Sequence, residues 1–252
     1  MWWFILAIAV CFLAVHAAKM IRLYLVLMEH KIGFSRFLLL YLKTTFVNLL
    51  IPFKAGEIYR IFAIGRESGV WQVGILSVLI DRFFDIAALL LVLLPLDVIF
   101  YGDISFITWI FLAIIVIIAC IYLSIEPTYQ YLNKYIIKEK NSGRSMAVLK
   151  GLDVVNNWYE FTKNLVQGRF ALIFLASFAG WVFEILALKA LAGFLAVPFG
   201  IGSFSQYIKS IFLAGESRIA STYTLVGAGV FLLLSIVGQL VYIIRKKKDK
   251  EP

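Results

Sequence analysis

The fold is decided by residues 106–123, which read FITWIFLAIIVIIACIYL and contain no charged side chain. A helix of that length rises about 27 Å, close to the thickness of a bilayer's hydrocarbon core. The rest of the chain has the same character, since 62% of its 252 residues are hydrophobic, 15% are charged and the mean hydropathy is +0.93. We therefore expect an all-α, polytopic membrane helix bundle of roughly five to seven spans, without a soluble domain.

The charge balance is positive, with 24 Lys and Arg residues against 15 acidic ones. These cations lie at the ends of apolar runs or in two membrane-flanking stretches, which indicates membrane topology and anionic headgroups and not nucleic acid. The two cysteines, Cys11 and Cys120, lie inside apolar runs, so we predict no disulfide, no metal site and no cofactor. No Lys or Arg precedes the first apolar run at Trp2, so we expect no cleaved signal peptide.

Flanking charges predict the topology of the first half, residues 1–126. The first apolar run, Trp2 to Ala18, is followed by four cations, which places the N-terminus outside the cell and this flank in the cytoplasm: Lys19, Arg22, Lys31 and Arg36. The weaker segment from Phe37 to Pro52 has basic residues on both sides, so we expect it to dip into the membrane and return. Val73 to Leu96 then crosses outward, and residues 106–123 cross back.

Residues 127–169 are polar and basic and are predicted to form a cytoplasmic linker. Within it, four residues at helical spacing predict a helix on the membrane or on the bundle, or else a solvated connector: Val148, Leu152, Val155 and Tyr159. The second half, residues 170–244, contains two apolar runs separated by the broken stretch Gly193 to Gly215. The basic tail, residues 245–252, places the C-terminus in the cytoplasm.

Each half thus reads helix, broken segment, helix, and the second half starts from the opposite side of the membrane. This order suggests an inverted repeat within one transmembrane domain, residues 1–252, although the two halves show no residue-level similarity. In such a repeat the broken segments meet near the middle of the membrane. We therefore expect Pro52 and Pro198 to lie close together.

The most informative polar stretch is residues 48–60, NLLIPFKAGEIYR. Pro52 and Gly56 break the helix, and Lys54, Glu57 and Arg60 place charges at the break. Unpaired N–H groups at a broken helix, with Lys or Arg beside them, are typical of a phosphate-binding corner. The alternative is a plain loop whose charges face water.

A second polar stretch, Asp81-Arg82-Phe83-Phe84-Asp85, lies inside the predicted span from Val73 to Leu96. Asp81 would be about 16 Å deep, where each charge costs roughly 2.5–3.5 kcal/mol unless it is paired or hydrated. The charged residues of both stretches sum to zero, as expected of a buried network: Lys54, Glu57, Arg60, Asp81, Arg82 and Asp85. A purely structural ion-pair network is the alternative. Glu184 is the counterpart in the second half, and His16 and Lys43 are weaker candidates.

These motifs resemble a known family. Asn48 to Arg60, followed by Asp81-Arg82-x-x-Asp85, is similar to the N-terminal signature of the flippase-like membrane domain of lysylphosphatidylglycerol synthase, the multiple peptide resistance factor. The family pattern is Asn, Pro, Gly-Glu-x-x-Arg and later Glu-Arg-x-x-Asp, so Asp81 replaces a glutamate. Pro198-x-Gly200-Ile201-Gly202 is similar to the family's Pro-Gly-Gly-Ile-Gly turn, with Phe199 replacing one glycine and Ser205 standing where an acid is usual. The stretch before this turn is shorter than in the family, as if a helix were missing.

The resemblance implies that the chain moves a lipid with a polar head, either an aminoacyl phosphatidylglycerol or a lipid-linked sugar, between leaflets of the cell membrane. Lys54, Arg60 and Arg82 would hold the lipid phosphate. The other implied substrate-binding residues orient these cations or shape the site: Asn48, Pro52, Gly56, Glu57, Asp81, Asp85, Glu184, Pro198, Gly200 and Gly202.

We find no catalytic residues and no space for the synthase's soluble domain, so we predict that the chain is not an enzyme. Expected partners are membrane lipids, with a membrane enzyme or a second copy of the chain as further possibilities. Two other functions stay open. One is a non-transporting membrane subunit of a cell-envelope enzyme, and the other is an ion-coupled transporter of a small solute.

Overall fold

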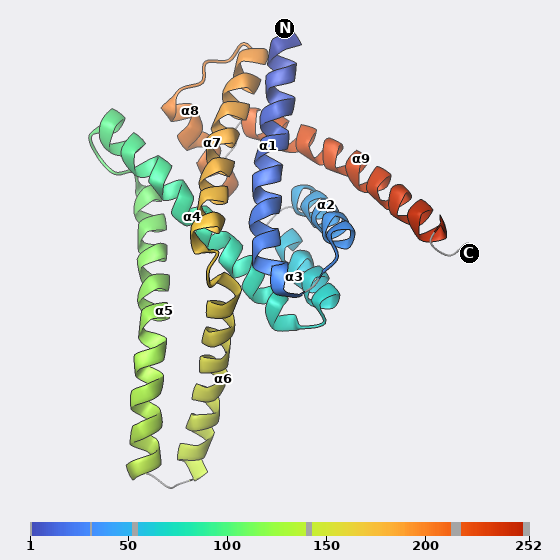
Figure 1. Ribbon diagram of the computed structural model, residues 1–252. Helices are drawn as coiled ribbons and strands as arrows, with labels where there is room; N and C mark the ends of the chain where they lie inside the picture. Colours follow the sequence, from blue (N-terminus) through green and yellow to red (C-terminus); the bar gives the residue numbers. More distant parts are fainter. Residues whose placement is uncertain (1, 31, 52–54, 140–142, 213–217, 249–252) are drawn as a thin grey trace.

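The structure is a computed structural model that describes residues 2–30, 32–51, 55–139, 143–212 and 218–248 (Figure 1). These ranges contain helices and no strand, which confirms the predicted all-α class. In chain order the helices are α1 (Trp2–Leu27), the short 3-10 helix η1 (Met28–His30), α2 (Phe34–Leu50), α3 (Ala55–Ser68), α4 (Trp71–Tyr101), α5 (Phe106–Glu139), α6 (Gly143–Val166), α7 (Phe170–Phe194), α8 (Ile201–Phe212) and α9 (Arg218–Lys248).

Four stretches are long and apolar enough to span a membrane. They are Trp2–His30, which joins α1 to η1, Phe106–Lys138 in α5, Phe170–Phe194 in α7 and Arg218–Ile244 in α9. Large apolar side chains remain exposed on these helices, for example Leu123 at 72% and Leu225 at 76%. So much exposed apolar surface is stable only against lipid, and the chain is therefore a membrane protein.

The span predicted from Val73 to Leu96 forms part of α4 but is not among these four. Helix α4 is 31 residues long, but charged side chains interrupt its apolar middle. In Figure 1 it runs obliquely from the α2–α3 pair to the start of α5. This oblique course carries the charges of α4 across the centre of the bundle.

Helices α1 and α7 form the backbone of the fold. They run antiparallel and side by side, and their contact is the most extensive between any two helices described (Figure 1). Small residues allow this close packing, since Gly193 of α7 lies against Phe4 and Gly180 lies against Ala18. The two charged residues near the end of α1, Lys19 and Arg22, therefore face α7 and α4 and not the solvent.

The first broken segment forms a helical hairpin of α2 and α3. Helix α2 ends at Leu50 and α3 begins at Ala55, as the sequence predicts. A Cβ atom at Gly56 would lie 2.3 Å from the Cα of Asn48, so the two helices meet backbone to backbone beside the break. Pro52 and Lys54 lie outside the described residues, so the predicted approach of Pro52 to Pro198 is not tested.

The described part of the second broken segment comprises the end of α7, the turn after it and α8. Pro198 lies in the turn that leaves the end of α7, where Gly193 packs against Phe4 in the first turn of α1. The predicted position of Pro198 near the middle of the membrane stays a prediction. The chain leaves α7 before it turns, with Ala196 at a φ of 53°, and only α8 returns into the bundle.

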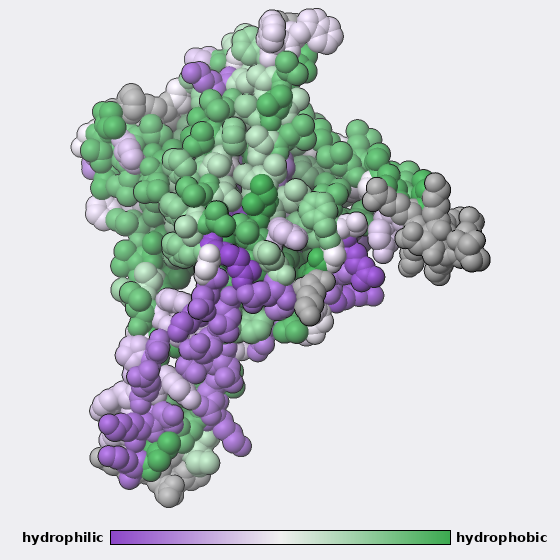
Figure 2. All heavy atoms as spheres, viewed as in Figure 1, coloured by the Kyte–Doolittle hydropathy of each residue, from purple (hydrophilic) through white to green (hydrophobic). Residues whose placement is uncertain are grey.

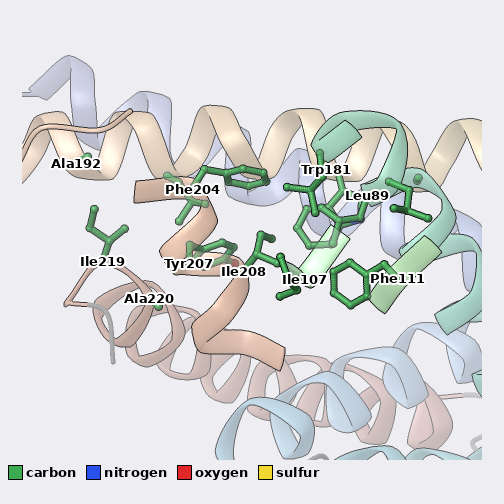
Figure 3. Packing of buried hydrophobic residues seen from close by; sticks show 14 of the residues in the cluster. Leu89, Ile107, Phe111, Trp181, Ala192, Phe204, Tyr207, Ile208, Ile219 and Ala220 are labelled. Carbon is green, nitrogen blue, oxygen red and sulfur yellow. The ribbon is translucent and has the colours of Figure 1, made fainter. Parts of the chain in front are cut away.

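Helix α8 is held by apolar contacts. Phe204, Tyr207 and Ile208 point from α8 towards Trp181 of α7 and Leu89 of α4, as Figure 3 shows. These residues belong to the largest buried cluster, which also includes residues of α5 and α9. These apolar contacts fix α8 beside α7. They also place the polar residues of α8 near the charged residues of α4 and α7.

The described part of residues 127–169 forms most of a long helical hairpin. Helix α5 continues through Pro127 to Glu139, and α6 returns beside it (Figure 1). Two hydrogen bonds join the pair, Tyr129 Oη to Asp153 at 2.8 Å and Tyr159 Oη to Glu126 at 3.1 Å.

Figure 2 shows that the distal part of this hairpin is hydrophilic and projects from the apolar body. Of the predicted apolar stripe, Tyr159 is buried, whereas Val148 and Val155 are half exposed. The two alternatives, a helix on the membrane or on the bundle and a solvated connector, both stay open.

The orientation in the membrane is open to a direct test. In a chain with Cys11 and Cys120 replaced by serine, a single cysteine at Lys150 should react with an impermeant maleimide only from the cytoplasmic side. The basic residues of the hairpin predict that this is the cytoplasmic face. A cysteine at Asp103, in the turn between α4 and α5, is the control and should react only from outside. Labelling of Lys150→Cys in intact cells would reverse the predicted topology.

Candidate functional site

A buried charge cluster lies where α1, α3, α4 and α7 meet. At its centre Arg22 donates from Nε to Asp81 at 2.6 Å and from Nη1 to Asp85 at 2.8 Å. The same Nη1 also donates to the hydroxyl of Ser177 at 3.0 Å. Arg22 is only 2% exposed and Asp81 only 1%, so this part of the cluster is shielded from solvent.

Helix α3 adds a second layer of charges. Arg60 donates from Nη1 to the other oxygen of Asp81 at 3.0 Å. Arg82 lies with Nε 3.0 Å from Glu57 and Nη1 3.5 Å from Asp85. We define the charge cluster by these six residues: Arg22, Glu57, Arg60, Asp81, Arg82 and Asp85.

Glycines position this second layer. A Cβ atom at Gly74 of α4 would lie 2.3 Å from the carbonyl oxygen of Ile61, so α3 and α4 touch through their backbones. Together with the contact at Gly56, this fixes α3 between α2 and α4. Glu57 and Arg60, one turn apart on α3, are thereby held against the charged middle of α4.

The charge cluster is neutral and is graded in exposure. It contains three arginines and three carboxylates, as a network in a medium of low dielectric requires. The exposed fraction of the arginine side chains rises from 3% at Arg22 to 11% at Arg60 and 29% at Arg82. The cluster therefore has a closed end at Arg22 and an open end at Arg82 and Glu57.

Two arginine donors near the open end form no hydrogen bond among the described groups, Nε of Arg60 and Nε of Arg82, although Nε of Arg82 lies 3.0 Å from Glu57 as an ion pair. Nε of Arg60 is buried and has no hydrogen-bond acceptor among the groups that the structure describes. A buried charged donor without a partner is costly and is normally satisfied by water or a ligand. The charge cluster thus has an accessible cation, Arg82, and a free hydrogen-bond donor, Nε of Arg60, on the same side.

Glu184 forms a separate polar site beside the charge cluster. It accepts a hydrogen bond from Nζ of Lys19 at 2.7 Å and another from the hydroxyl of Tyr207. This site joins α1, α7 and α8. Trp181, one turn before Glu184, donates to the backbone carbonyl of Asp85 at 3.0 Å and links the two sites.

Comparison with known proteins gives one family match. Residues 1–215 match the protein family described as the lysylphosphatidylglycerol synthase TM region. The chain belongs to this family. The match includes α1 to α8, while α9 follows it. No curated protein and no solved structure matches the chain.

The structure brings together most of the charged family motif. Glu57, Arg60, Asp81, Arg82 and Asp85 are in one network, and Asn48 and Gly56 pack against each other at the adjacent helix break. The second family motif is elsewhere: Pro198 and Gly200 are exposed in the turn before α8, and Gly202 is exposed in its first turn. There the hydroxyl of Ser203 donates to the carbonyl of Pro198.

Sequence reasoning missed four residues of these sites, namely Arg22, Lys19, Ser177 and Tyr207. Lys19 and Arg22 were assigned to a cytoplasmic flank, yet α1 continues to Leu27 and both make ion pairs inside the bundle. A usable signal was present. Arg22 shares one helix face with Val15, Ala18 and Val26, all of which are buried.

Proposed function

We propose that this chain is a flippase-like translocator that moves a phospholipid or a lipid-linked sugar between leaflets, without catalysing a reaction. The observation that supports it is the graded charge cluster, closed at Arg22 and open at Arg82, inside a membrane bundle. Membership in the family described as the lysylphosphatidylglycerol synthase TM region supports a lipid as the ligand.

In this proposal the lipid phosphate binds at the open end. Arg82 exchanges its loose contact with Glu57 for the phosphate, and the free Nε of Arg60 donates a further hydrogen bond. Glu57 is then available to a cationic group on the head, such as a lysyl amine. The closed end, Arg22 with Asp81 and Asp85, holds the helices in place, and the acyl chains stay in the bilayer.

Replacing Arg82 with alanine tests the proposal. The variant should keep a melting temperature in detergent close to that of the wild type, because Asp81 and Asp85 retain Arg22 and Arg60. Flipping of an anionic lipid in liposomes should fall about 10- to 100-fold, the loss of one hydrogen-bonded charge at a phosphate. Arg82→Lys should recover part of the rate, since it keeps the charge but not the two-point grip.

The matched control is Lys163→Ala, which removes a cation from an exposed ion pair with Glu160 on α6. It should flip lipid at the wild-type rate. Wild-type flipping by Arg82→Ala, or a sharp loss of its stability, would reject the phosphate-binding role. Lipid binding without flipping would favour a non-transporting membrane subunit. Dependence on a proton gradient and not on lipid would favour a solute transporter.

A further inference from the structure

A second polar cavity lies away from the charge cluster. It has a volume of about 580 Å³ and lies between the α2–α3 hairpin and α9, and no residue of the charge cluster lines it. This volume is in the range of sites that bind small molecules. Figure 2 shows a hydrophilic area on this side of the body, between the α2–α3 pair and the distal half of α9.

The cavity carries an excess of positive charge. Arg36 at the start of α2, Lys43 further along α2 and Arg66 near the end of α3 all line it, against one carboxylate, Glu67. Arg36 and Glu67 form a loose pair at 3.8 Å, with side chains 67% and 35% exposed. In the part of the chain that the structure describes, Lys43 and Arg66 form no ion pair, so two cations remain for an anion.

Helix α9 supplies neutral polar groups on the opposite wall. Ser235, Gln239 and Tyr242 line the cavity from α9, where Gly238 packs on Leu39 and Leu42 of α2. The hydroxyl of Ser235 is buried, and within the described ranges it has no hydrogen-bond partner. A buried hydroxyl without a partner, in a cavity that unpaired cations also line, is an unfilled donor for an anionic oxygen.

Apolar surface adjoins these polar groups. Leu39, Leu40 and Phe62 line the same cavity, and Phe62 is 55% exposed. Along α9, Ile236 and Leu240 are also about half exposed and present an apolar strip next to Gln239. A cationic cavity that opens onto apolar helix surface matches an amphiphile with a phosphate head, whereas free phosphate would use only the polar part.

We propose that this cavity is a second lipid site, which binds the phosphate of an anionic phospholipid whose chains lie along α2 and α9. The inference goes beyond the proposed translocation and holds whether or not the chain moves lipid. The site is also not confined to the family region, because α9 follows the residues that match the family.

The test compares lipid binding by the full chain purified in mild detergent. Native mass spectrometry with short-chain phosphatidylglycerol, phosphatidylcholine or inorganic phosphate should show preferential binding of phosphatidylglycerol. Lys43→Ala combined with Arg66→Ala should weaken that binding about 100-fold, or tenfold per cation. The control pair, Lys134→Ala with Lys150→Ala, removes the same charge from the exposed hairpin and should bind as the wild type does.

Further variants keep the outcomes distinct. If the double variant proves unstable, Gln239→Glu gives an independent test. It adds a carboxylate from α9 at nearly constant side-chain size, and it should also weaken the binding of phosphatidylglycerol. Arg82→Ala removes the phosphate-binding cation of the charge cluster and should still leave one bound phosphatidylglycerol, the one at this cavity, because Arg82 does not line it. If Arg82→Ala abolishes the preference and Lys43→Ala with Arg66→Ala does not, the lipid binds at the charge cluster and the second site is rejected. Equal binding of phosphatidylcholine, or full competition by inorganic phosphate, would also reject it.

Discussion

Replacing Arg22 with alanine should destabilise the chain by about 3–5 kcal/mol, because the change leaves two buried carboxylates with too little positive charge. Arg22 is the cation closest to both Asp81 and Asp85, and Asp81 is almost fully buried. We expect a much lower melting temperature in detergent and poor accumulation in the membrane. Both are measured on fluorescently tagged protein by size-exclusion chromatography after heating.

Two comparisons show whether unpaired charge is the cause. Arg36→Ala removes an arginine that is 67% exposed and should change stability by less than about 1 kcal/mol. Arg22→Met combined with Asp85→Asn removes one charge of each sign and should recover part of the lost stability. Wild-type stability of Arg22→Ala would mean that water reaches the closed end of the charge cluster, contrary to its burial.

Replacing Gly56 with alanine should have the next largest effect, about 3 kcal/mol or more. The added Cβ would lie 2.3 Å from the Cα of Asn48, and a backbone atom cannot move aside as a flexible side chain can. The α2–α3 hairpin must then open, and Glu57 and Arg60 move away from α4. We therefore expect lower thermal stability and loss of lipid flipping in the same variant.

Gly151→Ala is the matched control, since this glycine also lies inside a helix, α6, and no atom lies within 4 Å of its added Cβ. Alanine there should be neutral or stabilise by about 0.5–1 kcal/mol through its helix propensity. If Gly56→Ala behaves like this control, the close approach of α2 and α3 is not required for the fold.

The apolar runs predicted the main helices well because hydrophobic length is a strong, local signal. The runs that contain Phe106, Phe170 and Ile219 all lie in helices that can span a membrane, and the break near Gly56 falls between α2 and α3. Five of the six residues of the charge cluster were also predicted from the sequence: Glu57 and Arg60 because they lie at the helix break, and the other three because charges inside an apolar run must find partners. Hence Asp81, Arg82 and Asp85 stood out.

The other residues of the candidate site could not be predicted, because their positions depend on tertiary contacts that a sequence pattern does not contain. A cation just after an apolar run reads as a membrane flank, although Arg22 lies inside because α4 and α7 supply partners from far along the chain. The charge balance did indicate that a further cation was needed, since the two carboxylates Asp81 and Asp85 outnumber the one arginine, Arg82. Lys54 was used to complete that balance, whereas Arg22 completes it among the described residues. The glycine contacts that position α3 could not be foreseen either.

The pairing of α1 with α7 also sets the order in which the protein can be made. Lys19 and Glu184 are 165 residues apart in the chain. At typical synthesis rates, roughly 8–33 s pass between the emergence of the first and the second. During that interval Lys19 has no Glu184 beside it, and a lone lysine in lipid is unfavourable. The first helix must therefore wait at the membrane surface or within the insertion machinery, and a ribosome stalled before α7 should leave α1 extractable by alkaline carbonate.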